Sequence, residues 1–242
     1  NFFLRISKYL NNKFYFNLSL LAENYYLNEN YKDSEKILNV FKNKDENYNW
    51  YRVKKIGKIL SEKGKENEAL KFTEKYFNST NKSSVKMLYD MANIYKRFEK
   101  YEEAIKYYSL LLTKVKKDSY AYSRILYRRG SSFERKGDYE KADKDLLYSL
   151  KIFPGEPYTM NYLAYSWLER NYKVNEAIEM LQRAYKKKEN DPYITDSVGW
   201  GYYLIGDYIN AEKYLKKAVQ LMPSDPIVND HYGDVLWKTG NK

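Results

Sequence analysis

A small residue, glycine or alanine, recurs about every 34 residues through the 242 residues of the chain. The seven positions are Ala22, Gly57, Ala92, Gly130, Ala164, Gly199 and Gly233. Three residues after each comes a large apolar side chain: Tyr25, Leu60, Tyr95, Phe133, Trp167, Tyr202 and Leu236. A fixed period of this length is typical of a chain made of stacked, equivalent units rather than one globular core.

Two further series of positions indicate a second helix in each unit. About twelve residues after the first small position stand Ser34, Ala69, Ala104, Ala142, Ala177 and Ala211. Seven residues later come Phe41, Tyr76, Leu111, Ser149, Ala184 and Ala218. Spacings of three, four and seven place residues on one face of a helix. The unit is therefore a pair of helices that cross where their side chains are small.

Glycine and proline fall at the ends of these expected helices. Gly64, Gly137, Gly206 and Gly240 stand where the first helix of a unit stops, a place that favours glycine. Pro157, Pro192 and Pro226 stand where a new first helix begins, and Pro154 and Pro223 follow a second helix. Gly201 has no place in this scheme, and Arg129 stands where most other units have an apolar residue.

This pattern resembles the tetratricopeptide repeat, a helix-turn-helix unit of 34 residues. The resemblance implies an all-α fold, a right-handed superhelical solenoid of about six and a half repeats, forming one domain over residues 1–242. The repeats span about 15–48, 50–83, 85–121, 123–156, 157–191, 192–225 and, in part, 226–242. Residues 1–13 are expected to form the second helix of a truncated preceding repeat, and more repeat is expected beyond Lys242.

The sequence favours a protein without a reaction centre. The glycines of the run from Asp196 to Tyr208 could suggest a phosphate loop, but the preceding strand and the lysine that such a loop needs are missing. The chain has one histidine and no cysteine, which disfavours zinc catalysis and a histidine-activated nucleophile. We therefore expect no enzyme activity, no metal and no cofactor.

Within the family, the first helices line the inner groove, so the register predicts which side chains face a partner. The candidate groove residues are Lys54, Lys58, Tyr89, Asn93, Arg124, Tyr127, Tyr165, Asp196, Trp200, Tyr203, Asp234 and Trp237. The groove is thus expected to be basic early and aromatic with acidic points later. Exposed aromatic side chains often carry recognition, so a protein or peptide partner is expected.

A C-terminal carboxylate and single-stranded RNA are two other candidate ligands for that groove. Some family members clamp a C-terminal carboxylate, and Lys54, Arg124 and Arg128 match this clamp by charge, but Lys58 and Asp90 replace its asparagines. Asp90 would repel a carboxylate. The net charge of +11 leaves a single-stranded RNA-binding repeat protein as the alternative function. The acidic groove residues oppose that alternative.

The last repeats contain two further short motifs, D-S-x-G-W from Asp196 to Trp200 and D-H-x-G-D-x-x-W from Asp230 to Trp237. These motifs resemble those in the C-terminal repeats of bacterial cell-envelope tetratricopeptide proteins. Some of those proteins are lipoprotein adaptors of carboxy-terminal processing proteases. The resemblance implies a periplasmic or outer-membrane-associated scaffold, with a protease among its possible partners and a membrane link only through a lipid anchor upstream. A cytoplasmic location is the alternative.

Overall fold

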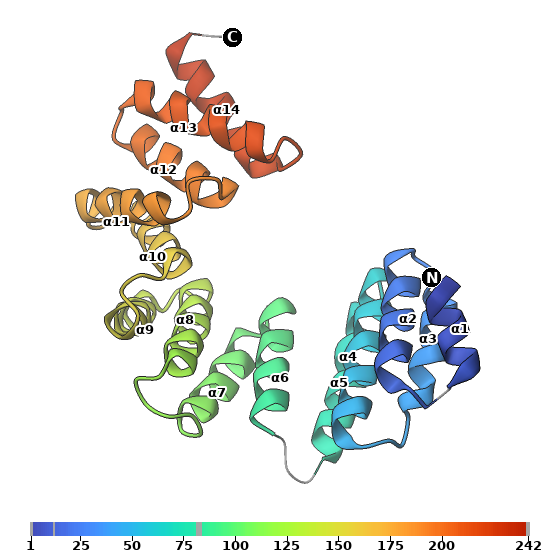
Figure 1. Ribbon diagram of the computed structural model, residues 1–242. Coiled ribbons are helices and arrows are strands. Elements are labelled where there is room, and N and C mark those ends of the chain that lie inside the picture. Colours follow the sequence, from blue (N-terminus) through green and yellow to red (C-terminus); the bar gives the residue numbers. More distant parts are fainter. Residues whose placement is uncertain (1, 12, 81–83, 241–242) are drawn as a thin grey trace. The chain divides into compact units, whose positions relative to one another are not determined.

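The computed structural model describes residues 2–11, 13–80 and 84–240, and its helices divide into two compact units. The first unit is Asn1–Lys100 and the second is Tyr101–Lys242 (Figure 1). The described residues form fourteen α-helices and one short 3-10 helix, with no strand among them. The all-α prediction is therefore confirmed. The expectation of one continuous solenoid stays a prediction, and each unit is described by itself.

The first unit contains six α-helices. They are α1 (Phe2–Leu10), α2 (Tyr15–Leu27), α3 (Tyr31–Leu38), α4 (Glu46–Glu62), α5 (Glu66–Ser79) and α6 (Val85–Arg97), with the 3-10 helix η1 (Asn39–Phe41) after α3. Helix α1 packs on α2, and Leu4 joins the cluster of Leu18, Leu21 and Phe41. The segment expected as a helix at the N-terminal edge is thus helical; residues 1 and 12 lie outside the described residues.

The second unit contains eight α-helices. They are α7 (Tyr101–Leu112), α8 (Tyr120–Arg135), α9 (Tyr139–Ile152), α10 (Pro157–Glu169), α11 (Val174–Lys187), α12 (Pro192–Leu204), α13 (Tyr208–Leu221) and α14 (Pro226–Thr239). Each of the pairs α8 and α9, α10 and α11, and α12 and α13 packs as a hairpin. The first helices α8, α10, α12 and α14 succeed one another along the stack, and α12 contacts both α10 and α14.

Local capping explains where individual helices begin. Helix α4 starts at Glu46 rather than near residue 50, because the Asp45 side chain accepts bonds from the backbone N–H groups of Asn47 and Tyr48. Helix α8 starts at Tyr120 because Ser119 accepts from the N–H of Tyr122. Pro157 is the first residue of α10, and its missing N–H costs no helical hydrogen bond there.

Most of the small positions of the repeat are buried, and two of the glycines lie where the helices of a pair meet. Ala22, Ala92 and Ala164 are almost fully buried. A Cβ atom added at Gly199 would lie 2.6 Å from the Leu215 Cγ atom of α13, and one at Gly130 would lie 2.9 Å from the Leu146 Cγ atom of α9. These glycines therefore allow the second helix of the pair to approach, as the register predicts.

Gly201, which the repeat pattern does not explain, has a packing role of its own. It is buried, and an added Cβ would lie 3.1 Å from the Leu168 Cδ1 atom and 3.4 Å from the Leu181 Cδ1 atom. Leu168 and Leu181 belong to α10 and α11, so Gly201 lets α12 approach the preceding pair. The glycine run from Asp196 to Tyr208 is thus explained by packing at Gly199 and Gly201 and by the helix end at Gly206.

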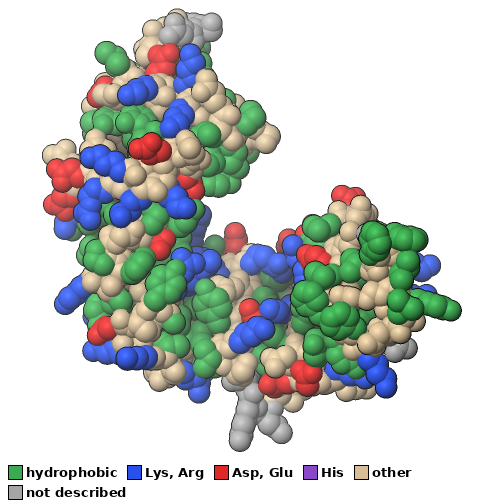
Figure 2. Space-filling model, viewed as in Figure 1, with side chains coloured by type: hydrophobic (Ala, Val, Ile, Leu, Met, Phe, Trp, Pro, Cys, Tyr) green, Lys and Arg blue, Asp and Glu red, His purple; other side chains and the backbone are tan. Residues whose placement is uncertain are grey.

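Positive charge is distributed over the surface. On the face shown in Figure 2, Lys and Arg side chains lie over both units and are interspersed with acidic, apolar and other groups. Scattered lysines of this kind are solvated rather than concentrated into one binding patch. Within the described residues, no helix is both long and apolar enough to cross a membrane.

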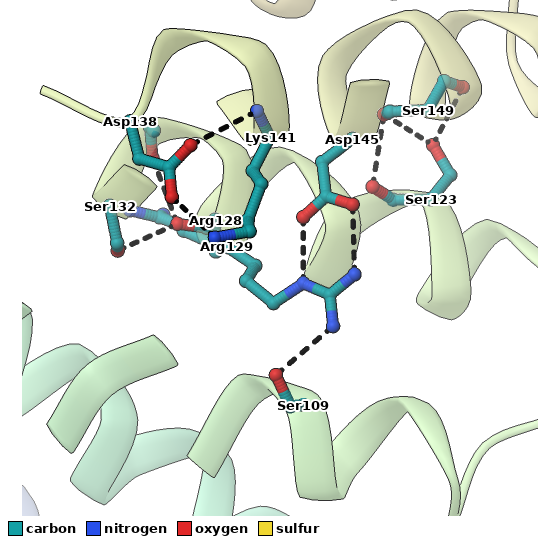
Figure 3. Close-up of polar contacts among 10 residues, drawn as sticks. Ser109, Ser123, Arg128, Arg129, Ser132, Asp138, Lys141, Asp145 and Ser149 are labelled. Atoms are coloured by element: carbon teal, nitrogen blue, oxygen red, sulfur yellow. Dashed lines mark hydrogen bonds and ion pairs between the residues drawn. The ribbon is translucent and has the colours of Figure 1, made fainter. Parts of the chain in front are cut away.

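Arg129 replaces the usual apolar residue with a polar contact between helices. Its guanidinium donates from Nε to Asp145 Oδ2 at 2.6 Å and from Nη2 to Asp145 Oδ1 at 2.8 Å (Figure 3). Its Nη1 atom donates to the Ser109 hydroxyl at 3.0 Å. The Asp145 side chain is only 8% exposed. Arg129 therefore joins α8 to both α9 and α7.

Candidate functional site

A cavity of about 650 Å³ opens on the first helices of the second unit. Residues of α8, α10, α12 and α14 line it, together with Tyr139 of α9 and Arg170 just beyond α10. The lining includes Tyr165 and Asp196, two of the residues that the sequence predicts for the groove. It also includes Glu134, Asn161 and Glu169. The cavity is therefore a mixed aromatic and polar site on the first helices.

Two tyrosines in this cavity are held as neutral hydrogen-bond donors. Burial, and then the nearby Glu169 and Asp196 carboxylates, raise the pKa of Tyr165 to about 12. Burial also raises the pKa of Tyr162, whose hydroxyl donates to Glu134 Oε2 at 2.6 Å. Both phenols therefore stay protonated at neutral pH, and each can act as a donor and as an apolar ring surface.

Beside the cavity, three rings of α12 and α14 form a stacked column. Trp200 lies parallel to Tyr203, with ring centroids 4.8 Å apart, and parallel to His231, with centroids 4.1 Å apart. The indole Nε1 atom donates to Glu169 Oε1 at 2.9 Å. Trp200 is half-buried, so it is held on several sides and still presents surface to solvent.

The chain's one histidine fixes the base of that column. His231 Nδ1 lies 3.0 Å from Asp196 Oδ2 and 3.1 Å from Asp196 Oδ1, and both side chains are buried. The contact joins α14 to α12 directly under Trp200. His231 therefore packs between helices and also positions Asp196, a predicted groove residue.

The first unit has a smaller cavity of about 280 Å³ with basic walls. Lys54 Nζ lies 2.7 Å from Asp90 Oδ2, and Asp90 also accepts from Trp50 Nε1 at 2.9 Å. Lys55 forms an ion pair with Glu23. Lys58 Nζ lies 4.6 Å from the centre of the Tyr26 ring. Because Asp90 neutralises Lys54, the structure gives the carboxylate clamp no support.

The remaining predicted groove residues have less defined surroundings. Asn93 donates from Nδ2 to the Tyr89 carbonyl at 2.9 Å, so this pair is linked along α6. Arg124 and Arg128 both lie over the edge region of the Tyr127 ring, about 6 Å from its centre. Asp234 and Trp237 are exposed on α14. The prediction that all twelve residues contact one partner stays a prediction.

Glu169 and Tyr162 are site residues that the sequence analysis missed. Glu169 comes four residues after Tyr165, so helical spacing places both on the same face of α10. That spacing could have identified it. Tyr162 comes directly after a groove position, and only the three-dimensional contact with Glu134 reveals its role.

No metal chemistry is indicated by the part of the chain that the structure describes. It contains no group of three or more His, Asp or Glu side chains placed to hold a metal ion. The His231–Asp196 contact has no third potential ligand of that kind beside it.

The family comparison identifies the repeats. The family model described as tetratricopeptide repeat matches residues 85–113 and 123–155. A tetratricopeptide-repeat protein of Thermus thermophilus has a similar structure, with a TM-score of 0.60 and 17% identity over 78% of this chain and 99% of that one. The protein MamA of Desulfovibrio magneticus gives a TM-score of 0.55 and 19% identity, over 64% of this chain and 85% of that one. The chain therefore contains tetratricopeptide repeats, and its fold is similar to those of solved tetratricopeptide-repeat proteins.

One further structure and two curated relatives are similar to the chain. The structure, YrrB, is described as a tetratricopeptide-repeat protein with an unusual peptide-binding site; its TM-score is 0.51, at 16% identity over 76% of this chain and 91% of that one. A tetratricopeptide repeat-containing protein of Pseudomonas aeruginosa is 34% identical over 110 residues, which is 46% of this chain and 18% of the relative. The human aspartyl/asparaginyl beta-hydroxylase is 39% identical over 62 residues, 26% of this chain and 8% of the enzyme. The chain thus spans less than a fifth of either relative's length.

Proposed function

We propose that this protein is a non-catalytic scaffold and that its second unit binds a protein segment along α10, α12 and α14. The observation that carries the proposal is the ring column of Tyr203, Trp200 and His231 beside the 650 Å³ cavity. Solenoid repeats commonly use their concave first-helix surface for binding.

The column has the properties of a recognition surface. Trp200 is fixed by two stacking contacts and by its hydrogen bond to Glu169, so a partner that packs on it immobilises no additional side chain. Tryptophan and tyrosine contribute large contact areas and dominate many interfaces. The peptide-binding site named for the similarly folded YrrB is consistent with a peptide as the ligand.

The envelope role belongs to the same proposal. The two short motifs similar to those of bacterial cell-envelope proteins contain Asp196, Trp200 and His231, and His231 contacts both of the other two residues in the structure. The similarity to a Pseudomonas aeruginosa repeat protein supports a bacterial setting. We therefore propose a periplasmic or outer-membrane-associated adaptor, with a carboxy-terminal processing protease as a candidate partner.

The test is selection of peptides from a random displayed library by the full chain, followed by affinity measurements on variants. We expect Trp200→Ala and Trp237→Ala each to weaken binding of the selected peptides by about 1–2 kcal/mol, because each removes an aromatic contact. Ile209→Ala, an exposed apolar truncation on α13, is the matched control and should leave affinity unchanged. Equal affinities for all three variants would remove the groove assignment.

A salt series separates this proposal from RNA binding. The affinity for single-stranded RNA should fall steeply with salt, since each phosphate contact releases a counterion. The affinity for a peptide on the ring column should change much less. Tight, steeply salt-dependent binding of an oligonucleotide that Trp200→Ala weakens would favour the RNA alternative.

A further inference from the structure

We propose that the cavity of the second unit selects a lysine or arginine side chain of the bound segment, with Glu169 and Asp196 as the carboxylates that receive it. This inference rests on the proposed function and specifies the chemistry of its ligand. It predicts a cation-selective subsite in a protein whose net charge is +11.

Three carboxylates from three successive first helices reach the cavity, and their partners are mainly neutral. Glu134 accepts from the Tyr162 hydroxyl, Glu169 accepts from the Trp200 indole, and Asp196 contacts His231. In the described part of the chain, no Lys or Arg forms an ion pair with Glu169 or Asp196. The nearest cation to Glu134 is its neighbour Arg135, at 3.9 Å and largely exposed.

Two carboxylates elsewhere in the same unit are neutralised by arginines of the chain itself. Asp145 is paired with Arg129 at 2.6 Å, and Asp143 is paired with Arg170 at 2.8 Å. Arg170 borders the cavity, but its contacts with Asp143 and with the Tyr139 ring direct its charge to α9. Arg135 borders the cavity beside Glu134, which leaves Glu169 and Asp196 as the two carboxylates there without a Lys or Arg partner among the described residues.

Two other features of the cavity fit a cation on a long apolar stem. The Oδ1 atom of Asn161 is buried and has no hydrogen-bond partner among the described residues, so the site contains an unused neutral acceptor. Tyr165 lies in the field of Glu169 and Asp196, which outweighs the opposing field of Arg135, and an aromatic face beside carboxylates favours a cation. A lysine or arginine side chain can place its methylenes on the tyrosines and its charge on the carboxylates.

The experiment uses the peptides that the full chain selects from the random displayed library. We expect lysine or arginine at one fixed distance from the aromatic-contacting residue in most selected sequences. In a selected peptide, exchanging that arginine for citrulline, or that lysine for N-acetyl-lysine, should weaken binding about tenfold, because a charge-assisted hydrogen bond becomes a neutral one.

Glu169→Gln tests the protein side of the same contact. The amide oxygen can still accept from Trp200, so the ring column is kept while the charge is removed. We expect about tenfold weaker binding of the charged peptide and little change for its neutral counterpart. Glu179→Gln, an exposed carboxylate on α11, makes the same charge change outside the cavity and should have no effect.

The outcomes separate this inference from the proposed function. Selected peptides that depend on Trp200 but carry no basic residue would overturn the cation subsite and leave the peptide-binding role intact. The same conclusion follows if Glu169→Gln and Glu179→Gln weaken the charged peptide equally. Selection of no peptide at all would overturn both. The exchange within the peptide needs no protein variant, so a folding defect in Glu169→Gln cannot obscure the result.

Discussion

At the end of each first helix, one residue lies in the left-handed backbone region whether or not it is glycine. The glycines there are Gly64, Gly137, Gly206 and Gly240, with φ between 72° and 85°. In the other three repeats the residues are Glu29, Glu99 and Asn171, with φ of 57°, 57° and 50°. The tight turn to the second helix therefore sets the conformation, and glycine relieves its cost where it occurs.

Gly206→Ala should therefore lower the free energy of unfolding by about 1 kcal/mol. An added Cβ at Gly206 meets no atom within 4 Å, so the loss comes from backbone strain alone. Gly233→Ala is the matched control, because its added Cβ is also unobstructed but its φ is not positive. Inside helix α14 this change should stabilise by about 0.5–1 kcal/mol. Chemical denaturation of both variants measures their free energies of unfolding. A change of the same sign in both variants would contradict the prediction.

The sequence predicts the structural role of residues that recur in every repeat. It does not predict the role of residues that occur in one repeat only. The small positions and the helix-ending glycines recur in each repeat, so the period alone assigns them. Gly201 occurs once, and its role depends on how closely Leu168 and Leu181 of the preceding pair approach. Likewise, nothing in the sequence pairs Arg129 with Asp145, which is sixteen residues away on another helix.

Among the helices of the second unit, α7, α8 and α9 are joined by a polar network as well as by apolar packing. The bidentate contact of Arg129 with Asp145 is supported by Ser109, and Ser123 and Ser149 bond to each other at 3.0 Å nearby (Figure 3). Such a network favours one geometry of the crossing, because each donor has a specific acceptor.

Removing one member of the Arg129–Asp145 pair should be costly, while removing both should not. We expect Asp145→Ala to destabilise by about 2 kcal/mol, since it leaves the guanidinium without its carboxylate. The double variant Arg129→Met, Asp145→Leu should restore most of that loss by apolar packing. A double-mutant cycle from chemical denaturation gives the coupling energy. Additive losses would show that the pair contributes no specific interaction.

Helical register predicts part of the candidate site. Tyr165 and Asp196, which stand at predicted groove positions of successive first helices, both line one cavity. Helical spacing places Glu169 one turn after Tyr165 on the same face, but only the structure shows that its side chain accepts from the Trp200 indole. Lys54 stands at a groove position too, but a cross-helix partner, Asp90, already binds it.

At the scale of the whole molecule, a cavity of the first unit and the cavity of the second differ in the charged side chains that border them. Lys54, Lys58 and Arg97 border the 280 Å³ cavity of the first unit, whereas the cavity of the second is bordered by carboxylates as well as by Arg135 and Arg170. A scaffold with two such cavities can distinguish two segments by charge, since like charges disfavour the wrong segment. Composition conceals this division, because it reports only the net charge of +11.

Tyrosine is the molecule's most abundant aromatic residue, with 29 positions, and several phenols in both units are buried. Burial and Glu23 raise the pKa of Tyr51 to about 12, and burial with Glu169 and Asp196 does the same for Tyr165. An unfolded tyrosine ionises near pH 10. Folding therefore favours the protonated form of these residues, and the stability of both units is linked to alkaline pH.

The free energy of unfolding should consequently fall as pH rises from about 10 to about 12. A raised pKa in the folded state means that the stabilisation is complete below the unfolded value and is lost on approach to the folded value. Between the two, the unfolded chain binds fewer protons than the folded chain. Denaturant titrations at several pH values measure the slope. Tyr165→Phe should make it shallower, whereas Tyr193→Phe, which removes an exposed phenol, should not; equal slopes would refute the linkage.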